Sequence, residues 1–305
     1  MPVIWKISQL NFKSRIIVSG VILDKSFKRN QVNGNRKESV FQLYKKKPFK
    51  NRIVHIQIGE SFEETLTGKD GSFTVFFDPS VRGELRVLEE GGNVIPMDQR
   101  YPFLFTESNS RLAVISDMDD TLILSHTKNF IKRVGTLLFV HPLKRKSIGF
   151  TENLLRGIQD LNGDIYYVSR SESNLFRVLS TFILKSSIPV GNLFLTPLLS
   201  WKQLVSNTKP DNFKFEVIST IIENSSKNHF VLIGDDTQYD LKVYLEIAKK
   251  YPDKILKICI RKTSIRKHRV TQNSLERIKE LGIPFLYFNK NSDWKPELSW
   301  IQKNS

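Results

Sequence analysis

From residue 111 onward, short apolar runs alternate with longer segments of helical periodicity, and this alternation restricts the fold more than any other feature of the chain. The apolar runs lie at 112–115, 165–168, 192–195, 230–233, 255–260 and 284–288. The helical segments lie at 151–161, 173–185, 213–223, 238–250 and 272–281. Strands separated by helices are typical of a mainly parallel sheet with helices on both faces. The sequence therefore predicts an α/β domain over residues 111–305.

The first 110 residues show no helical periodicity and instead contain short β-type runs. These runs lie at 15–18, 20–23, 40–44, 52–58, 72–77 and 84–88, and turn signals such as Asp70-Gly71 and Gly91-Gly92 separate them. Their spacing predicts a small antiparallel all-β sandwich over residues 1–110. The stretch 65–73 also resembles a hairpin of immunoglobulin-like and transthyretin-like modules, so we expect a sandwich of one of these two kinds.

Three carboxylates crowd the end of the first apolar run of the α/β domain. They are Asp117, Asp119 and Asp120, and Thr121 follows them. Neighbouring like charges repel and lose solvation when buried, so a packed core does not favour such a cluster. A divalent cation removes the conflict, and Mg²⁺ takes oxygen ligands, often carboxylates together with phosphate oxygens. The pattern favours phosphoryl-transfer chemistry, and the alternative is a solvated aspartate-rich turn.

Further polar groups recur at later points of the same pattern. Ser169 follows the second apolar run, Lys214 opens a helical segment, and Asp235 and Asp240 follow the fourth run. Ligands of open α/β sheets bind beyond the carboxyl ends of the strands, so we expect these groups to meet Asp117. Their order and spacing resemble the four motifs of the haloacid-dehalogenase (HAD) superfamily of phosphohydrolases.

The HAD resemblance implies a Rossmannoid parallel sheet of the HAD-like kind. In such proteins a cap follows the first or second motif. Here the corresponding segments, 122–150 and 196–212, are short. We therefore expect a minimal cap, which leaves room for a substrate held on a larger object such as a lipid surface or a polymer.

The residue types suggest how a phosphoryl group would be transferred. Asp117 is placed to attack phosphorus and form an aspartyl-phosphate. Asp119 can protonate the leaving oxygen and later deprotonate water. Lys214 supplies positive charge to the nucleophile and to the transferring group. We predict Asp117, Asp119 and Lys214 as the catalytic residues, with Lys202 or Lys209 as alternatives to Lys214.

Mg²⁺ is the expected cofactor, because the phosphate charge must be neutralised before a carboxylate attacks it. The predicted metal residues are Asp117, Asp119 through its backbone carbonyl, Asp235 and Asp240. Hard cations prefer such oxygen ligands. For Asp240 the alternative is an acid that the dipole favours at a helix N-terminus.

Three residues are predicted to contact the substrate. Thr121 and Ser169 offer hydroxyl groups, and Arg170 offers a guanidinium for a phosphate oxygen. The alternatives are a turn cap for Ser169 and a structural or solvated role for Arg170.

Within the superfamily, one family fits these motifs best. The segment Gly234-Asp235-Asp236-Thr237-Gln238-Tyr239-Asp240, with Tyr244 after it, is more distinctive than the first aspartate motif. Together with the runs at 116–122, 167–179 and 188–195, it resembles the catalytic domain of the actin-patch-associated phosphatidate phosphatases over residues 110–265. That resemblance implies Mg²⁺-dependent hydrolysis of phosphatidate to diacylglycerol and phosphate. The chain departs from the family pattern near the expected substrate mouth. In the stretch Ser169-Arg170-Ser171-Glu172-Ser173, Glu172-Ser173 stands where the family usually has Pro-Trp, and Thr196-Pro197 stands where the family usually has an Arg.

The formal net charge of +16 favours a polyanionic partner. Basic residues concentrate at 25–52, 144–146 and 261–269. An anionic phospholipid or membrane surface is the preferred partner. Two alternatives stay open: a phosphatase that acts on nucleic-acid ends, and a non-catalytic protein that binds a membrane or scaffold. Each basic block can also be an ordinary solvated face, and the sequence names no protein partner for the sandwich.

The cysteine content and the hydropathy of the chain indicate its cellular compartment. The one cysteine, Cys259, lies in an apolar run and is expected to be a buried core thiol. The chain contains no apolar run long enough for a transmembrane helix and no evident signal peptide. We therefore expect a cytoplasmic protein that associates peripherally with membranes.

Overall fold

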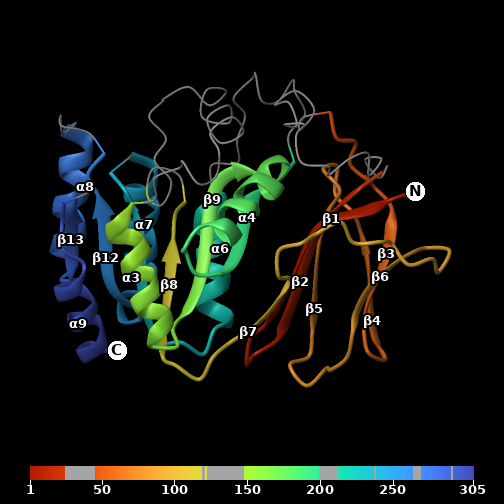
Figure 1. The fold of residues 1–305 in the computed structure, drawn as a ribbon, viewed down its shortest axis with the longest axis horizontal. Helices are drawn as coiled ribbons and strands as arrows, with labels where there is room; N and C mark the ends of the chain where they lie inside the picture. The colour runs from red at the N-terminus through yellow and green to blue at the C-terminus, as the bar shows by residue number, and fades with distance from the viewer. Residues whose placement is uncertain are drawn as a thin grey trace.

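The computed structural model describes residues 1–24, 45–118, 121, 148–198, 212–236, 238–263, 269–289 and 291–305. A β-sandwich at the N-terminal end lies beside an α/β unit whose central sheet is flanked by helices (Figure 1). The expected strand at 40–44 and the basic stretch at 144–146 lie outside the described residues.

The central sheet of the α/β unit has six parallel strands in the order β10-β9-β8-β11-β12-β13. Their bounds are β8 (Leu112–Ser116), β9 (Asp164–Glu172), β10 (Asn192–Thr196), β11 (His229–Asp235), β12 (Ile255–Arg261) and β13 (Phe285–Phe288). Every residue of β8 is buried, as expected of a parallel strand that is covered on both faces. The predicted parallel sheet is confirmed.

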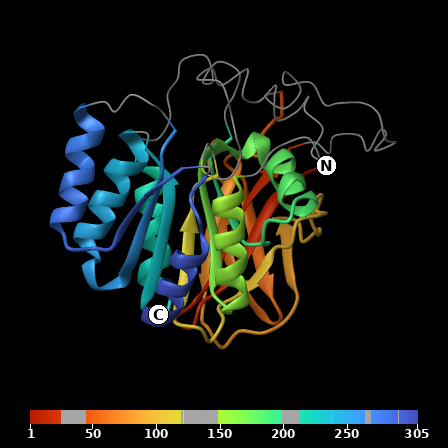
Figure 2. The same cartoon turned by 60° about the vertical axis from the view of Figure 1, so that its left-hand side comes forward.

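Helices cover both faces of this sheet (Figure 2). They are α3 (Gly149–Asp160), α4 (Phe176–Lys185), α6 (Phe213–Asn224), α7 (Gln238–Lys250), α8 (Arg269–Glu280) and α9 (Lys295–Asn304), with short 3₁₀ turns η2 (Ser173–Leu175) and η3 (Pro252–Lys254). Side chains of α3, α4 and α9 join one hydrophobic core, and those of α6, α7 and α8 join another. The five predicted helices are found, and α9 was not predicted.

Cys259 lies in β12 and is fully buried. Burial raises the pKa of its thiol to about 12. The thiolate is therefore suppressed near neutral pH, and the prediction of a core thiol is confirmed.

The sandwich consists of two sheets, ordered β5-β2-β1-β7 and β4-β3-β6. The strands are β1 (Val3–Asn11), β2 (Ile16–Leu23), β3 (Ile53–Ile58), β4 (Ser61–Leu66), β5 (Ser72–Phe77), β6 (Leu85–Glu89) and β7 (Leu104–Thr106). The two runs predicted at 15–18 and 20–23 form the single strand β2, and β1, β4 and β7 were not predicted. One expectation was wrong in part: β7 pairs with β1 in parallel, so the sandwich is not wholly antiparallel.

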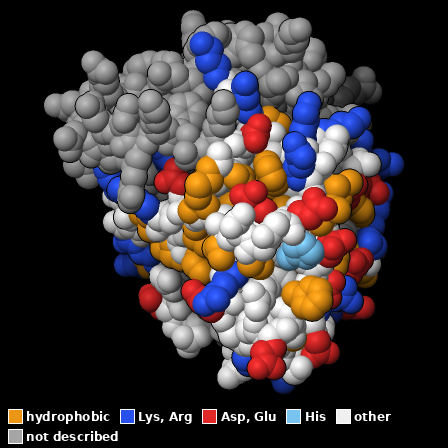
Figure 3. All heavy atoms as spheres, turned by 90° about the vertical axis from the view of Figure 1, so that its right-hand side faces the viewer, with side chains coloured by type: hydrophobic (Ala, Val, Ile, Leu, Met, Phe, Trp, Pro, Cys, Tyr) orange, Lys and Arg blue, Asp and Glu red, His pale blue; other side chains and the backbone are white. Residues whose placement is uncertain are grey.

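The two sheets of the sandwich enclose a core of their own, which includes Ile7, Val18, Val54 and Val75. On the outer face, hydrophobic and charged side chains are interspersed (Figure 3). The exposed side chains of Phe62, Leu66 and Val94 belong to this half of the chain. The immunoglobulin-like or transthyretin-like topology stays a prediction, as does the domain boundary at residue 110.

The sandwich and the α/β unit share a buried seam along β1. Val3 and Trp5 join the core of one face of the central sheet, and Leu10 joins the core of the other face. Hydrogen bonds also cross the seam, from Asn192 Nδ2 to Ser8 Oγ (2.6 Å) and from the Tyr101 hydroxyl to the Gly191 carbonyl (2.7 Å). The seam therefore fixes the sandwich against the sheet that carries the predicted motifs. Within the described part of the chain, no helix is long and apolar enough to cross a bilayer.

Candidate active site

Three of the predicted carboxylates meet at the carboxyl edge of the central sheet. Asp117 follows β8, Asp235 is the last residue of β11, and Asp240 lies in the first turn of α7. Their carboxylate oxygens lie within 4.8 Å of one another, and all three side chains are buried. β8 and β11 are neighbours in the sheet, and the Asp117 N–H donates to the Ile233 carbonyl (2.8 Å). The pairing of these strands thus brings together groups that are far apart in the sequence.

Lys214 lies inside this carboxylate cluster. It is the second residue of α6, and only 2% of it is exposed. Its Nζ donates to Asp117 Oδ1 and to Asp240 Oδ1, each at 2.6 Å. Burial by itself lowers the pKa of Lys214, but the two carboxylates outweigh it and hold the pKa above its ordinary value. Lys214 is therefore an ammonium, and the alternatives Lys202 and Lys209 lie outside the described residues.

The cluster fits a hard divalent cation. Three buried carboxyl groups lie together here, and repulsion between like charges in a buried place is what a bound cation relieves. Oxygen donors at this spacing are those that Mg²⁺ takes. Asp117 and Asp235 are the main candidates for ligands, since Asp240 is turned toward Lys214 and toward the Asp235 backbone.

Asp119 and Asp120 lie outside the described residues, so the acid–base role and the carbonyl ligand predicted for Asp119 stay predictions. Thr121 is fully buried, and its Oγ1 has no hydrogen-bond partner among the described residues. Ser169 is also fully buried, and its Oγ accepts the Ser171 N–H at 2.9 Å. That bond is the one expected of a turn-capping serine, and the role of Ser169 toward a substrate stays a prediction.

Arg170 lies close to this site through an aromatic contact. Its guanidinium carbon is 3.8 Å from the centre of the Tyr239 ring, and Tyr239 directly precedes Asp240. Stacking of a guanidinium on an aromatic face is favourable and fixes the plane of its donors. No role was predicted for Tyr239 from the sequence. Its position between Gln238 and the predicted metal residue Asp240 could have indicated one.

Tyr244 and Gly234 form the contact between α7 and the end of β11, beside the carboxylates. The Tyr244 hydroxyl donates to the Ile233 carbonyl (2.8 Å), and Tyr244 lies one helical turn beyond Asp240. A Cβ on Gly234 would lie 2.7 Å from the Tyr244 ring and 3.0 Å from Asp240 Oδ2. The glycine therefore lets the helix α7 side chains approach the end of β11.

Asp236 has a different task from its neighbour Asp235. Its carboxylate accepts hydrogen bonds from the Thr263 N–H (3.0 Å), the Thr263 hydroxyl and the Tyr287 hydroxyl (2.7 Å). These partners follow or belong to β12 and β13. Asp236 therefore connects the ends of three neighbouring strands, β11, β12 and β13.

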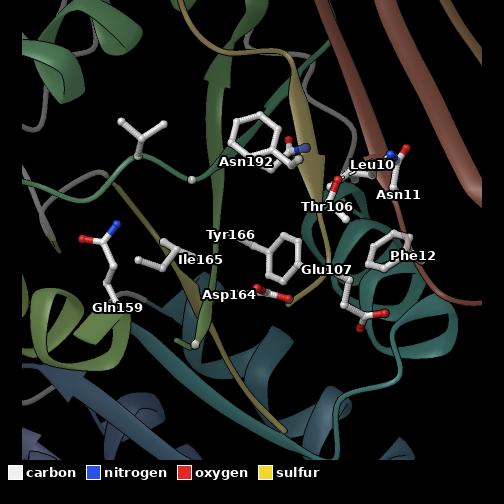
Figure 4. Close-up of a pocket in the computed structure, with 14 residues that line it drawn as sticks. Leu10, Asn11, Phe12, Thr106, Glu107, Gln159, Asp164, Ile165, Tyr166 and Asn192 are labelled. Carbon is white, nitrogen blue, oxygen red and sulfur yellow. Dashed lines mark hydrogen bonds between the residues drawn. The ribbon is translucent and has the colours of Figure 1, made fainter. Parts of the chain in front are cut away.

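A cavity of about 140 Å³ lies at the other edge of the sheet, away from the carboxylate cluster. It opens between the sandwich and the amino ends of β9 and β10, and Asp164 and Glu107 lie around Tyr166 in its wall (Figure 4). Asp164 pairs with the buried Lys227 at 3.0 Å, and Glu107 accepts the Ser226 N–H. Both acids of this cavity are thus engaged with neighbouring groups, and the predicted site residues lie at the opposite edge of the sheet.

The fold and the site together define an α/β domain with a buried carboxylate–lysine centre at the carboxyl edge of a parallel sheet. Residues 112–262 match the family model described as "Phosphatidate phosphatase APP1, catalytic domain". The predicted resemblance of this part of the chain to the actin-patch-associated phosphatidate phosphatases is confirmed.

Two curated proteins are similar in sequence to this chain. The phosphatidate phosphatase APP1 of Saccharomyces cerevisiae is 28% identical over 177 residues, which is 56% of this chain and 29% of that protein. An uncharacterised protein of Schizosaccharomyces pombe is 26% identical over 174 residues, or 55% of this chain and 29% of its own length. The matched part thus spans well under half the length of either relative.

Solved structures align with this chain only at low sequence identity and low TM-score. A carbohydrate acetylesterase from Xanthomonas citri aligns with 92% of this chain and 65% of its own, at 8% identity and a TM-score of 0.31. A minor pilin from Streptococcus sanguinis aligns with 84% of this chain and 87% of its own, at 10% identity and a TM-score of 0.32.

Proposed function

We propose that this protein is a Mg²⁺-dependent phosphatase of the HAD type, which hydrolyses phosphatidate to diacylglycerol and phosphate. The observation that carries the proposal is the contact of Lys214 with both Asp117 and Asp240, beside Asp235, at the carboxyl edge of the sheet. A nucleophilic carboxylate, a cation and a metal-binding carboxylate are the groups that the reaction requires. The match of residues 112–262 to the phosphatidate phosphatase family supports the substrate.

In the proposed reaction an Asp117 oxygen attacks the phosphorus, and the bond between phosphorus and the ester oxygen breaks. A proton from Asp119 goes to that oxygen as diacylglycerol leaves. Water then gives up a proton to Asp119 and attacks the phosphorus of the aspartyl-phosphate, which releases inorganic phosphate and restores Asp117.

The other residues of the site prepare this reaction. Asp117, the Asp119 carbonyl and Asp235 would hold Mg²⁺, which when bound neutralises phosphate charge. Lys214 reduces the repulsion between Asp117 and the incoming phosphate, and its position is fixed by the Asp240 carboxylate. Arg170 is supported as a phosphate contact because Tyr239 holds its guanidinium at the site.

The substrate is proposed to reach the site from a membrane surface. The basic character of the chain supports attraction to anionic lipid. It equally allows the nucleic-acid-end phosphatase, whereas the Asp117–Lys214–Asp240 contacts argue against a non-catalytic binding protein. The cytoplasmic location and the partner of the sandwich stay predictions.

A substrate panel tests the proposal. Wild type is compared on phosphatidate vesicles, a small soluble phosphate ester and oligonucleotides with 3′- or 5′-terminal phosphates, with Mg²⁺ and with excess chelator. We expect Mg²⁺-dependent release of phosphate, highest with phosphatidate, and no release by Asp117→Asn. Full activity in chelator would contradict the mechanism, and a preference for oligonucleotides would favour the nucleic-acid alternative.

A further inference from the structure

A β-bulge in β1 redirects a lysine into the seam between the sandwich and the α/β unit. The pairing of β1 with β2 shifts between Ile4, which faces Ile22, and Lys6, which faces Val21. Ile4 and Ile7 both point into the sandwich core, so Trp5 and Lys6 between them both turn to the other side. Bulges of this kind re-aim side chains and are common beside functional sites.

Lys6 is an unusual occupant of such a seam. It is 9% exposed, and its Nζ lies 5.9 Å from the centre of the ring of Phe176, the first residue of α4. It forms no hydrogen bond or ion pair with any described residue. Burial lowers the pKa of Lys6 to about 8. A buried ammonium that lacks an acceptor is costly, and an anion next to it would remove that cost.

Other positive groups surround the same place. Lys46 Nζ and the Arg177 guanidinium lie 3.7 Å and 4.6 Å from the centre of the Trp5 ring. α4 has no side-chain cap at its N-terminus, where the helix dipole is positive. The N–H of its first residue, Phe176, already donates to the Ser173 carbonyl, and the buried acid Glu172 precedes η2, so the cations are the main attraction for an anion here. Arg177 pairs with Asp98, a half-exposed ion pair at 2.6 Å. A helix N-terminus favours an anion, and the cations around this one add to that preference.

The positive cluster lies on the same edge of the sheet as the carboxylate centre. Trp5 Nε1 donates to the Ser173 carbonyl (2.8 Å), just beyond the end of β9, and Ser173 Oγ donates to the Thr196 carbonyl (2.8 Å). Arg170, which stacks on Tyr239, lies in the same last part of β9. Figure 1 shows α4 at this end of the molecule, between the central sheet and the start of β1.

We propose that Lys6, Arg177 and the N-terminus of α4 form a second phosphate-binding site, in the seam beside the catalytic edge. The Arg177 fork suits two phosphate oxygens, the Lys6 ammonium suits a third, and the Trp5 ring forms the floor. The ligand is a phosphate group, carried either by a phospholipid that is not being hydrolysed or by free inorganic phosphate. The site is independent of the proposed hydrolysis, because none of its residues belongs to the carboxylate centre.

Lys6 itself provides a local test. Lysines are reductively methylated with ¹³C, the Lys6 resonance is assigned with Lys6→Met, and its titration is followed by NMR with phosphate or with chloride at equal ionic strength. We expect phosphate to raise the Lys6 pKa in a saturable way and Arg177→Gln to weaken this response about tenfold or more. Lys69→Gln, which removes an exposed charge from the same sandwich, should leave it unchanged.

The two sources of phosphate are separated with vesicles of phosphatidylcholine, with and without phosphatidylglycerol, whose phosphodiester is not a phosphomonoesterase substrate. If phosphatidylglycerol vesicles raise the Lys6 pKa and inorganic phosphate competes with them, the site takes a lipid headgroup. If only inorganic phosphate raises the Lys6 pKa, the site takes free phosphate. The proposal is overturned if neither probe changes the Lys6 pKa more than chloride does. It is also overturned if Lys69→Gln weakens the response of the Lys6 pKa to phosphate as much as Arg177→Gln does.

Discussion

At the scale of the residue, adjacent side chains of one motif have separate tasks. Asp235 points into the carboxylate cluster with Asp117, whereas Asp236 accepts hydrogen bonds from Thr263 and Tyr287. Sequence alone assigns both to the same acidic motif. The division follows from the alternation of side chains at the end of a strand, which sends neighbours to opposite sides.

The pair Asp235→Asn and Asp236→Asn tests this division. We expect Asp235→Asn to raise the Mg²⁺ concentration for half-maximal activity at least about tenfold, since a carboxylate ligand is lost, with little change in stability. We expect Asp236→Asn to lower the free energy of unfolding by about 1–2 kcal/mol, since one acceptor is lost, with an unchanged Mg²⁺ requirement. Mg²⁺ titrations of activity and urea unfolding of both variants measure the two effects. A change in the Mg²⁺ requirement of Asp236→Asn would contradict the assignment.

A second prediction at this scale concerns pH and Lys6. Burial lowers the pKa of Lys6 from 10.5 in the unfolded chain to about 8 in the folded protein. Between these values the unfolded chain binds more protons, so this group makes stability rise with pH, and its penalty is fully present below pH 8. Lys6→Met should therefore raise the unfolding free energy near pH 7 by up to about 3 kcal/mol more than near pH 10.5. Urea unfolding in phosphate-free buffer at both pH values, with Lys69→Gln as control, measures the difference, and an equal effect at both would refute it.

At the scale of the element, the approach of α7 to β11 makes the site. Asp240 and Tyr244 extend from one face of α7, and both lie against Gly234 at the end of the strand. The helix reaches this position because a glycine leaves the space for it. The glycine of the motif is therefore a packing requirement of this helix–strand contact.

Gly234→Ala tests that requirement. The added methyl would lie 2.7 Å from the Tyr244 ring and 3.0 Å from Asp240 Oδ2, so both side chains must move. We expect a loss of about 1–3 kcal/mol in unfolding free energy and a fall in kcat, because Asp240 positions Lys214. The control is Gly149→Ala at the start of α3, where nothing lies within 4 Å of the added atom. Wild-type activity in Gly234→Ala would show that Asp240 does not need this position.

At the scale of the whole molecule, the two units are not independent. β1 contributes side chains to the sandwich core and to both cores of the α/β unit. A strand shared among three cores couples their stabilities, because unfolding of the sandwich exposes the seam side of the central sheet. We therefore expect the chain to unfold in one cooperative transition.

Leu10→Ala tests the coupling. Leu10 is 5% exposed and belongs to the α/β core, although it lies on a sandwich strand. We expect it to lower the free energy of unfolding by about 2–5 kcal/mol in a single transition seen by both far-UV circular dichroism and tryptophan fluorescence. Leu104→Ala removes a 52% exposed leucine from β7 and should cost less than about 0.5 kcal/mol. Two separate transitions, with only one shifted by Leu10→Ala, would refute the coupling.

Local pattern was sufficient to predict much of this protein. The strands of the central sheet contain short apolar runs that alternate with helical segments, and Asp117, Lys214 and Asp235 lie at the ends of the expected elements. Carboxyl ends of parallel strands meet at one edge, so their convergence followed from the element order. β1 and β4 were missed because each mixes polar and apolar residues along its length, with burial decided by what packs against it.

Tertiary structure decided what local pattern does not encode. The sequence by itself determined the class of fold, the order of the strand-end motifs and the family resemblance, because these depend on periodicity and on residue types at fixed spacing. Only the folded chain decided that Asp240 holds Lys214, that Asp236 holds Thr263, and that Lys6 turns into the seam. Each of these depends on contacts between distant segments or on a one-residue bulge, and both are set by packing across the whole molecule.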